Sequence, residues 1–168
     1  NLGDLRFKNI EEAWGLNHMG VSFGAALGDL DGDGDLDLVV SNFDEPVSVY
    51  RNNSTSANLV KIRLQGTDSN RWGVGARVYI ETTAGRQVRE LTLARGYMST
   101  DEPVIHFGLG EAEQIDRLTV RWPSGRVQHF ENLPANRLYS INERTAAIEQ
   151  TPPGPWASMF APSPSNEL

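Results

Sequence analysis

The sequence predicts an all-β protein, most of which folds as an antiparallel β-sandwich or small barrel. Short runs of alternating apolar and polar residues recur along the chain, and Gly or Pro interrupts most of them. Few segments remain that are long enough to form a helix. With 168 residues, 39% of them hydrophobic and including four Trp, six Phe and four Tyr, the chain can form a substantial core.

The first 52 residues contain three runs that we expect to be strands, at residues 21–28, 36–41 and 47–51. Each run is short, and the last two alternate in a period of two, as half-buried strands do. Residues 5–7 are a further candidate strand. Close spacing of short strands predicts a small antiparallel sheet in this region.

Residues 53–145 carry seven further candidate strands and make up the predicted sandwich or barrel. They are residues 59–64, 76–81, 87–93, 105–107, 117–122, 126–130 and 138–141. Pro123-Ser124-Gly125 lies between two of them and predicts a hairpin turn, which places Trp122 in the core. Residues 146–168 are rich in Pro and Ser and are expected to be a linker or tail, unless Trp156, Met159 and Phe160 dock onto the body.

The segment between the first two predicted strands has the pattern of a calcium loop. Asp29, Asp31, Asp33 and Asp37 stand at positions 1, 3, 5 and 9, Asp35 at position 7, and Gly32 and Gly34 lie between them. Ca²⁺ takes six to eight oxygen ligands, and a tight loop supplies carboxylates on alternate residues and a main-chain carbonyl at position 7. An acidic surface turn without a specific metal is the alternative.

This loop differs from an EF-hand. Position 12 is Val40, where an EF-hand carries a bidentate Glu, and the flanking residues are expected to be strands instead of helices. The spacing therefore predicts a static calcium site that joins two strands.

The unit of strand, acidic loop and strand headed by Phe23-Gly24 resembles the FG-GAP or VCBS repeat of β-propellers. The resemblance covers residues 20–52 and implies Ca²⁺ bound by the side chains of Asp29, Asp31, Asp33 and Asp37 and by the carbonyl of Asp35. A propeller needs several blades, and the sequence has no second Asp-x-Asp-x-Asp-Gly. Residues 1–52 are therefore expected to be a partial blade, the last of a larger parent, with the remaining blades as its partners.

A second resemblance covers about half of the chain. Five motifs, in order and spacing, look like the ASPIC/UnbV domain, which in that family follows FG-GAP repeats. The motifs lie at residues 70–78, 95–99, 106–110, 120–125 and 136–137.

Composition excludes several classes of partner and chemistry. A formal net charge of -7 argues against binding to nucleic acid, and there is no run of 18 apolar residues that would insert into a membrane. The absence of Cys excludes disulfides, thiol catalysis and Cys-ligated zinc. Weak calcium sites fill outside cells, so we expect a secreted, periplasmic or cell-surface location.

The sequence offers no catalytic constellation. Gly73-Val74-Gly75-Ala76 leads into an alternating run and is interpreted as a tight turn, not as a dinucleotide site. Possible ligand-binding residues are Arg71, Arg89, Arg95, His106 and Arg121, because arginine forks pair with carboxylates. Solvent-facing or internally paired arginines are the alternative.

Together these patterns predict a non-enzymatic, calcium-binding interaction or adhesion-type module that meets a protein or glycan on an extracellular surface. The alternative is a glycan-binding or accessory enzyme role in polysaccharide or small-molecule metabolism, since some family members are encoded beside enediyne biosynthesis genes.

Overall fold

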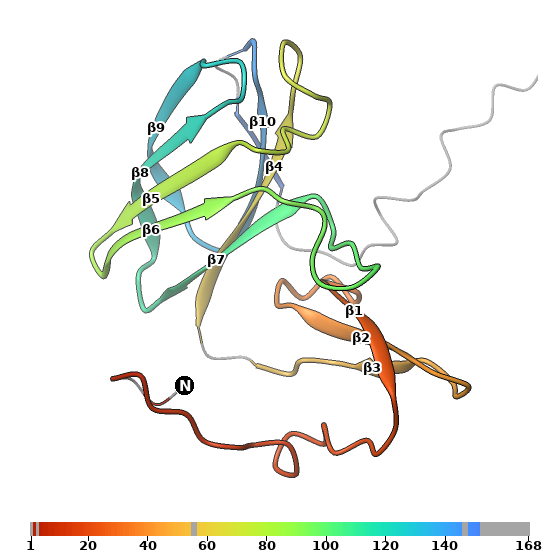
Figure 1. Ribbon diagram of the computed structural model, residues 1–168. Coiled ribbons are helices and arrows are strands. Elements are labelled where there is room, and N and C mark those ends of the chain that lie inside the picture. Colours follow the sequence, from red (N-terminus) through yellow and green to blue (C-terminus); the bar gives the residue numbers. More distant parts are fainter. Residues whose placement is uncertain (1, 3, 55–56, 146–147, 152–168) are drawn as a thin grey trace, which may run out of the picture.

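The computed structural model describes residue 2 and residues 4–54, 57–145 and 148–151. Eleven strands in three sheets account for its regular structure, and the described residues include no helix (Figure 1). Within this described part, therefore, no helix is long and apolar enough to cross a membrane. The predicted all-β class is confirmed.

Residues 22–50 form a small antiparallel sheet with the strand order β1-β2-β3. Its strands are β1 (Ser22–Gly28), β2 (Asp37–Asn42) and β3 (Ser48–Tyr50), close to the three predicted runs. The acidic loop joins β1 to β2. The candidate strand at residues 5–7 is wrong, because Leu5 has a φ of 58°, which no strand accommodates.

The larger part is a sandwich of two four-stranded sheets. One sheet has the order β6-β5-β8-β9, with β5 (Arg77–Thr82), β6 (Gly85–Glu90), β8 (Gln114–Arg121) and β9 (Val127–Pro134). The other has the order β11-β10-β4-β7, with β4 (Asn58–Gln65), β7 (Val104–Gly110), β10 (Arg137–Asn142) and β11 (Ile148–Thr151). All seven predicted strands of this region are present.

The two sheets remain separate, so the sandwich is the correct choice over the barrel. The amide nitrogen of Gln87 on edge strand β6 donates to the carbonyl of Gly108 on edge strand β7, at 2.8 Å, and bridges one side. The second sheet is mixed instead of wholly antiparallel, because β10 runs parallel to β4.

Alternating side chains of both sheets form the core. On β5 and β8, Val78 and Val120 pair in register and are fully buried, as is Phe107 on β7. Trp122 is 3% exposed at the start of the predicted hairpin turn, and its indole N–H donates to Gln128 at 2.8 Å. Its predicted core position is confirmed.

Residues 148–151, which the sequence assigned to the tail, form strand β11 against β10. Only Ile148 of this strand packs on the core, so the run carries little apolar pattern. The proposed docking of Trp156, Met159 and Phe160 lies outside the described residues.

The small sheet meets the sandwich along the edge of β1. The backbone N–H groups of Ala25 and Leu27 donate to the side chains of Ser99 (3.0 Å) and Asp101 (2.9 Å), in the segment that precedes β7. A Cβ on Gly24 would lie 3.0 Å from the Ser99 hydroxyl and 3.3 Å from the Tyr97 carbonyl, so the close approach favours glycine.

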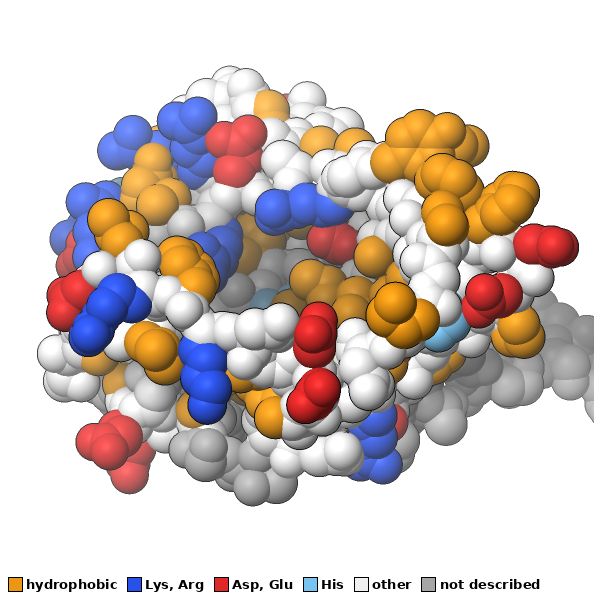
Figure 2. Space-filling view, turned by 60° about the horizontal axis from the view of Figure 1, so that its bottom comes forward, with side chains coloured by type: hydrophobic (Ala, Val, Ile, Leu, Met, Phe, Trp, Pro, Cys, Tyr) orange, Lys and Arg blue, Asp and Glu red, His pale blue; other side chains and the backbone are white. Residues whose placement is uncertain are grey.

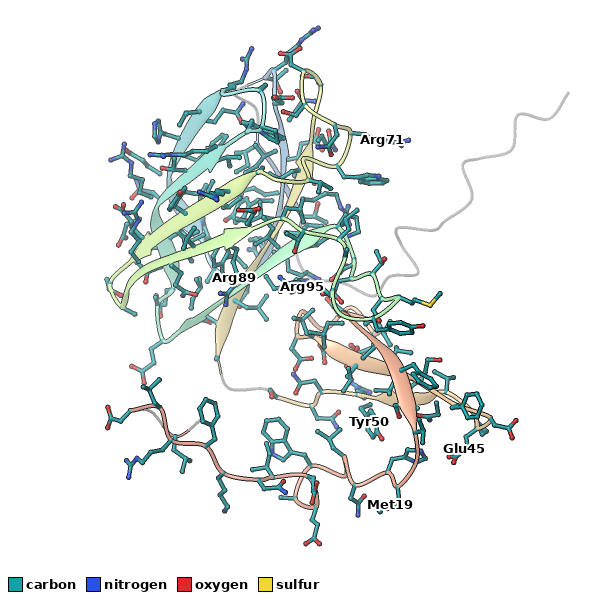
Figure 3. The ribbon with its side chains drawn as sticks, in the orientation of Figure 1. Met19, Glu45, Tyr50, Arg71, Arg89 and Arg95 are labelled. Carbon is teal, nitrogen blue, oxygen red and sulfur yellow. The ribbon has the colours of Figure 1, made fainter. Side chains whose placement is uncertain are left out.

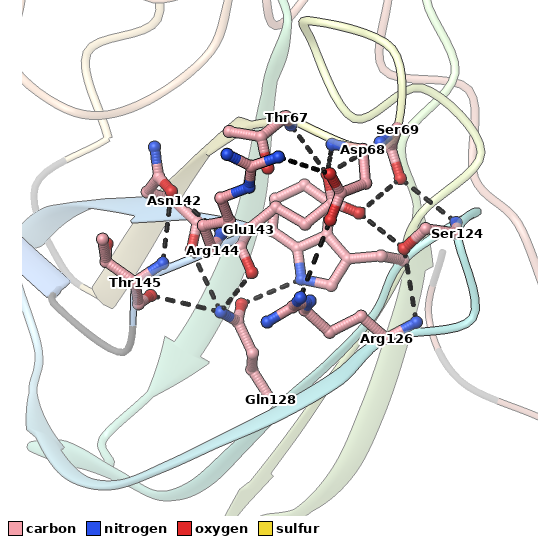
Figure 4. Close-up of polar contacts among 11 residues, drawn as sticks. Thr67, Asp68, Ser69, Ser124, Arg126, Gln128, Asn142, Glu143, Arg144 and Thr145 are labelled. Carbon is pink, nitrogen blue, oxygen red and sulfur yellow. Dashed lines mark hydrogen bonds and ion pairs between the residues drawn. The ribbon is translucent and has the colours of Figure 1, made fainter.

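A buried carboxylate joins the loops at the opposite end of the sandwich (Figure 4). One oxygen of Glu143 accepts the backbone N–H groups of residues 67–69 at 2.7–2.8 Å, and the other accepts the hydroxyls of Ser69 (2.7 Å) and Ser124 (2.6 Å). Burial alone would raise the pKa of Glu143, but these donors lower it from 4.5 to about 2. The fully buried side chain is therefore ionised and satisfied.

Candidate metal centre and adjoining groove

Two buried carboxylates hold the backbone of the acidic loop. Asp29, which is fully buried at the end of β1, accepts the N–H groups of Gly32 (2.8 Å) and Gly34 (3.1 Å). Asp37, 2% exposed at the start of β2, accepts those of Leu30 and Asn52, each at 2.8 Å. The strand ends thus fix both ends of the loop.

The middle of the loop is poorly supplied with donors. Asp31 and Asp33 each accept one backbone N–H within the loop, at 3.2 and 3.1 Å. Both carboxylate oxygens of Asp35 are buried without a hydrogen-bond partner. Burial, and after it the neighbouring charge of Asp33, raises the pKa of Asp35 from 3.8 to about 6.

Two cationic side chains reach the loop from outside it. The ammonium of Lys61, a buried residue on β4, pairs with Asp29. Arg51 places Nε 2.6 Å from Asp31 Oδ2 and a terminal nitrogen 3.8 Å from Asp33 Oδ2, although the Asp31 oxygen lacks hydrogen-bond geometry. The loop carries five carboxylates, and these two cations compensate two of them, so a net charge of -3 remains.

The carboxylates that remain fit a hard divalent cation. One oxygen from each of Asp29, Asp31 and Asp37 lies within 4.8 Å of the others. Two oxygens that bind Ca²⁺ at about 2.3–2.6 Å can be up to about 5 Å apart, so these three can share one ion. Oδ2 of Asp31, which accepts no hydrogen bond, is a group that such an ion would satisfy.

This geometry refines the set of residues that the sequence indicated. Asp29, Asp31 and Asp37 converge, whereas the carboxylates of Asp33 and Asp35 do not belong to that group. Sequence reasoning missed Lys61, which lies 32 positions from Asp29. Its place in an alternating strand resembled that of any outward-facing charge.

A groove of about 640 Å³ opens between the small sheet and the sandwich. Strands β1 and β2 form one wall, and residues 89–106 form the other. Aliphatic and aromatic side chains dominate the lining, among them Phe23, Leu27, Leu38, Val40, Leu91 and Ile105. Figure 2 shows this face hollowed, with hydrophobic side chains inside the hollow and charged side chains around it.

Three of the five possible ligand-binding residues line this groove. Arg89 and Arg95 lie between the sandwich and the small sheet in Figure 3, and His106 places Nε2 2.6 Å from Oε1 of Glu102. Arg71 instead lies over the ring of Trp72, at 5.1 Å, and Arg121 over that of Tyr79, at 5.3 Å. Neither of these two lines the groove.

Comparisons with known proteins identify one part of the chain. Residues 66–148 match the family model described as ASPIC and UnbV. The chain is 32% identical over 129 residues to cartilage acidic protein 1 of Mus musculus and 30% identical over 145 residues to that of Homo sapiens. These matches cover 74% and 84% of this chain but only 20% and 22% of the relatives.

A solved structure also resembles the chain, a putative cell adhesion protein from Bacteroides ovatus. It is 14% identical, with a TM-score of 0.33 over 79% of this chain and 60% of the other, a likeness too low to inform the fold or function. The chain spans about a fifth of the length of the curated relatives that it matches. Residues 66–148 therefore resemble the family described as ASPIC and UnbV.

Proposed function

We propose that this chain is a non-enzymatic interaction module of an extracellular protein, in which Ca²⁺ stabilises the acidic loop of a terminal FG-GAP-type blade beside the ASPIC and UnbV domain. The observation that carries the proposal is the acidic loop at the junction of the two parts. Asp29 of the loop contacts Lys61 of the sandwich, yet three negative charges stay uncompensated. A bound divalent cation would reduce the uncompensated negative charge from three to one.

An extracellular role draws support from the relatives, which are named for cartilage. The free calcium concentration outside cells fills sites that are too weak to bind in the cytosol. The remaining blades of a longer parent are the first partners that we expect for the small sheet.

Exposed aromatic side chains support a role in protein interaction. Phe23 and Phe43 make an edge-to-face contact with ring centres 5.7 Å apart, and Tyr97 lies 6.2 Å from Phe23. All three are more than half exposed, and Met98 beside them is 89% exposed. A contiguous exposed apolar patch of this kind is typical of a protein contact surface.

Calcium linkage tests the metal part of the proposal. Calcium at 100 times its dissociation constant should stabilise the chain by about 2.7 kcal/mol, and EDTA should reverse the effect. Asp37→Asn should abolish the response, whereas Asp44→Asn, in the turn between β2 and β3 and outside the loop, should keep it. Equal melting temperatures with calcium and with EDTA would disprove the calcium site.

Binding to immobilised extracellular matrix proteins tests the interaction part. Retention should fall when Tyr97→Ser and Met98→Ser are combined, while Val127→Ser, an exposed apolar residue on β9, should have no effect. Retention on glycans alone, or turnover of a glycan, would instead support the glycan-binding or accessory enzyme role.

A further inference from the structure

One cation that lines the groove between the small sheet and the sandwich, Arg89, has no counter-charge among the described residues. Each carboxylate there already has a partner within the chain. Glu90 pairs with Arg77 at 2.8 Å, and Glu102 contacts His106 at 2.6 Å. Asp101 accepts the N–H of Leu27 and lies 3.7 Å from Nε of Arg95.

Arg89 has no carboxylate partner among the residues that the structure describes. It pairs in register with Val78, whose side chain is fully buried, so Arg89 lies on the inner face of edge strand β6. Its guanidinium carbon is 5.9 Å from the centre of the Phe107 ring. Arg89 also lines the groove. A guanidinium presents a planar fork of donors that matches a carboxylate.

We propose that this groove binds a small hydrophobic carboxylic acid, whose carboxylate pairs with Arg89 and whose apolar body lies between β1 and residues 91–105. The volume of about 640 Å³ is within the range of pockets that hold small organic ligands. The mainly apolar walls explain why the body of the ligand should be hydrophobic. The groove shares Phe23 and Tyr97 with the exposed aromatic patch, and the ligand adds a further binding partner to the interaction module.

The structure favours a small molecule over an extended peptide. A peptide would dock on the wall formed by β1 by adding a strand to its edge, and it would use the edge N–H groups of Ala25 and Leu27. Ser99 and Asp101 already occupy these two donors. A ligand of this groove can therefore use only side-chain contacts and the charge of Arg89, and an amphipathic acid matches both.

Titration of the calcium-saturated 168-residue chain with octanoate, followed by amide chemical shifts, tests the proposal. We expect saturable shifts at Gly24, Leu27 and Gly96, which line the groove. Octanamide, which has the same body without the charge, and acetate, which has the charge without the body, should each bind at least about tenfold more weakly. Octanamide or acetate binding as tightly as octanoate, or no saturable shift with octanoate, would overturn the proposal.

Variants separate Arg89 from the other arginines. Arg89→Gln should weaken octanoate binding by about tenfold, and Arg89→Lys should restore part of it, since the charge returns without the fork. Arg121→Gln is the matched control, because Arg121 lies on the outer face of the same sheet and should leave the affinity unchanged. Unchanged affinity in a folded Arg89→Gln chain, or equal losses in the two glutamine variants, would refute the role of Arg89. Repeating the titration in EDTA distinguishes a failure of this site from a failure of the calcium proposal.

Discussion

Glu143 and the acidic loop are two solutions to the same problem, that of a carboxylate withdrawn from water. Glu143 stands alone and receives five hydrogen bonds, three from backbone N–H groups and two from serine hydroxyls. The loop gathers five carboxylates, and Asp35 receives none. The pKa of Glu143 falls to about 2, while that of Asp35 rises to about 6.

The difference teaches that enough hydrogen-bond donors outweigh the effect of burial on the pKa of a carboxylate. Glu143 is the more buried of the two, yet it is the more acidic, because its donors are built into the fold. The loop provides too few donors for its charge, so its stability depends on a cation from outside. The stability of the sandwich therefore does not depend on calcium, whereas that of the small sheet is expected to.

Removal of the Glu143 carboxylate should have the largest effect. Glu143→Ala leaves three backbone N–H groups and two hydroxyls without their acceptor, and should lower the free energy of unfolding by about 4 kcal/mol. Urea denaturation measures the loss. Glu131→Ala, an exposed residue on β9, is the control and should change stability by less than about 0.5 kcal/mol. A similar small loss for Glu143→Ala would show that the network does not stabilise the sandwich.

Acid and base should affect the two regions in opposite ways. The folded pKa of Glu143 is lowered, so its stabilisation is complete above pH 4.5 and is lost as pH falls toward about 2, by about 3 kcal/mol in all. The folded pKa of Asp35 is raised, so without calcium its contribution is present below pH 3.8 and is lost as pH rises through about 6.

Amide exchange in EDTA, compared between pH 4 and pH 7, measures both regions at once. After correction for the intrinsic exchange rates, protection of β2 should decrease with rising pH, while that of β10 should hold. Parallel changes in the two strands would contradict the contrast.

Lys61→Met should act mainly on the calcium-free protein. Without the ammonium, fully buried Asp29 keeps only its two backbone donors, and stability should fall by about 2 kcal/mol in EDTA. Saturating calcium should reduce the loss, because the ion supplies the missing positive charge. Lys8→Met, at an exposed position, should show no such dependence. Thermal melts of both variants with and without calcium make the measurement, and an equal loss in both conditions would rule out the exchange of ammonium for metal.

The smallest effect concerns the contact between the regions. Ser99→Ala removes the acceptor of the Ala25 N–H and should cost about 1 kcal/mol. The loss should appear as faster amide exchange at Ala25, with β10 unaffected. Ser54→Ala, whose hydroxyl contacts only the neighbouring Asn52, is the control. Slower or unchanged exchange at Ala25 would show that Ser99 does not hold this edge.

Local patterns made most of the fold predictable, and long-range partners did not. Short apolar or alternating runs located ten of the eleven strands, and Asp on alternate residues around Gly32 and Gly34 located the loop, because each pattern lies within a few residues. Lys61 and Glu143 could not be assigned their roles, since their partners lie 32 and up to 76 positions away. The groove was equally invisible, because Arg89 and Leu27 come together only when the two parts pack.

The side chains of Ser99 and Asp101 also determine where the small sheet can grow. They occupy the two N–H groups through which a new strand would join β1, so that edge is closed to pairing by another chain. Strand β3 is the other edge, and it is only three residues long. Any strand that extends this sheet, from a longer parent or from a second copy, must therefore enter beside Ser48–Tyr50, which gives the module a single direction of assembly.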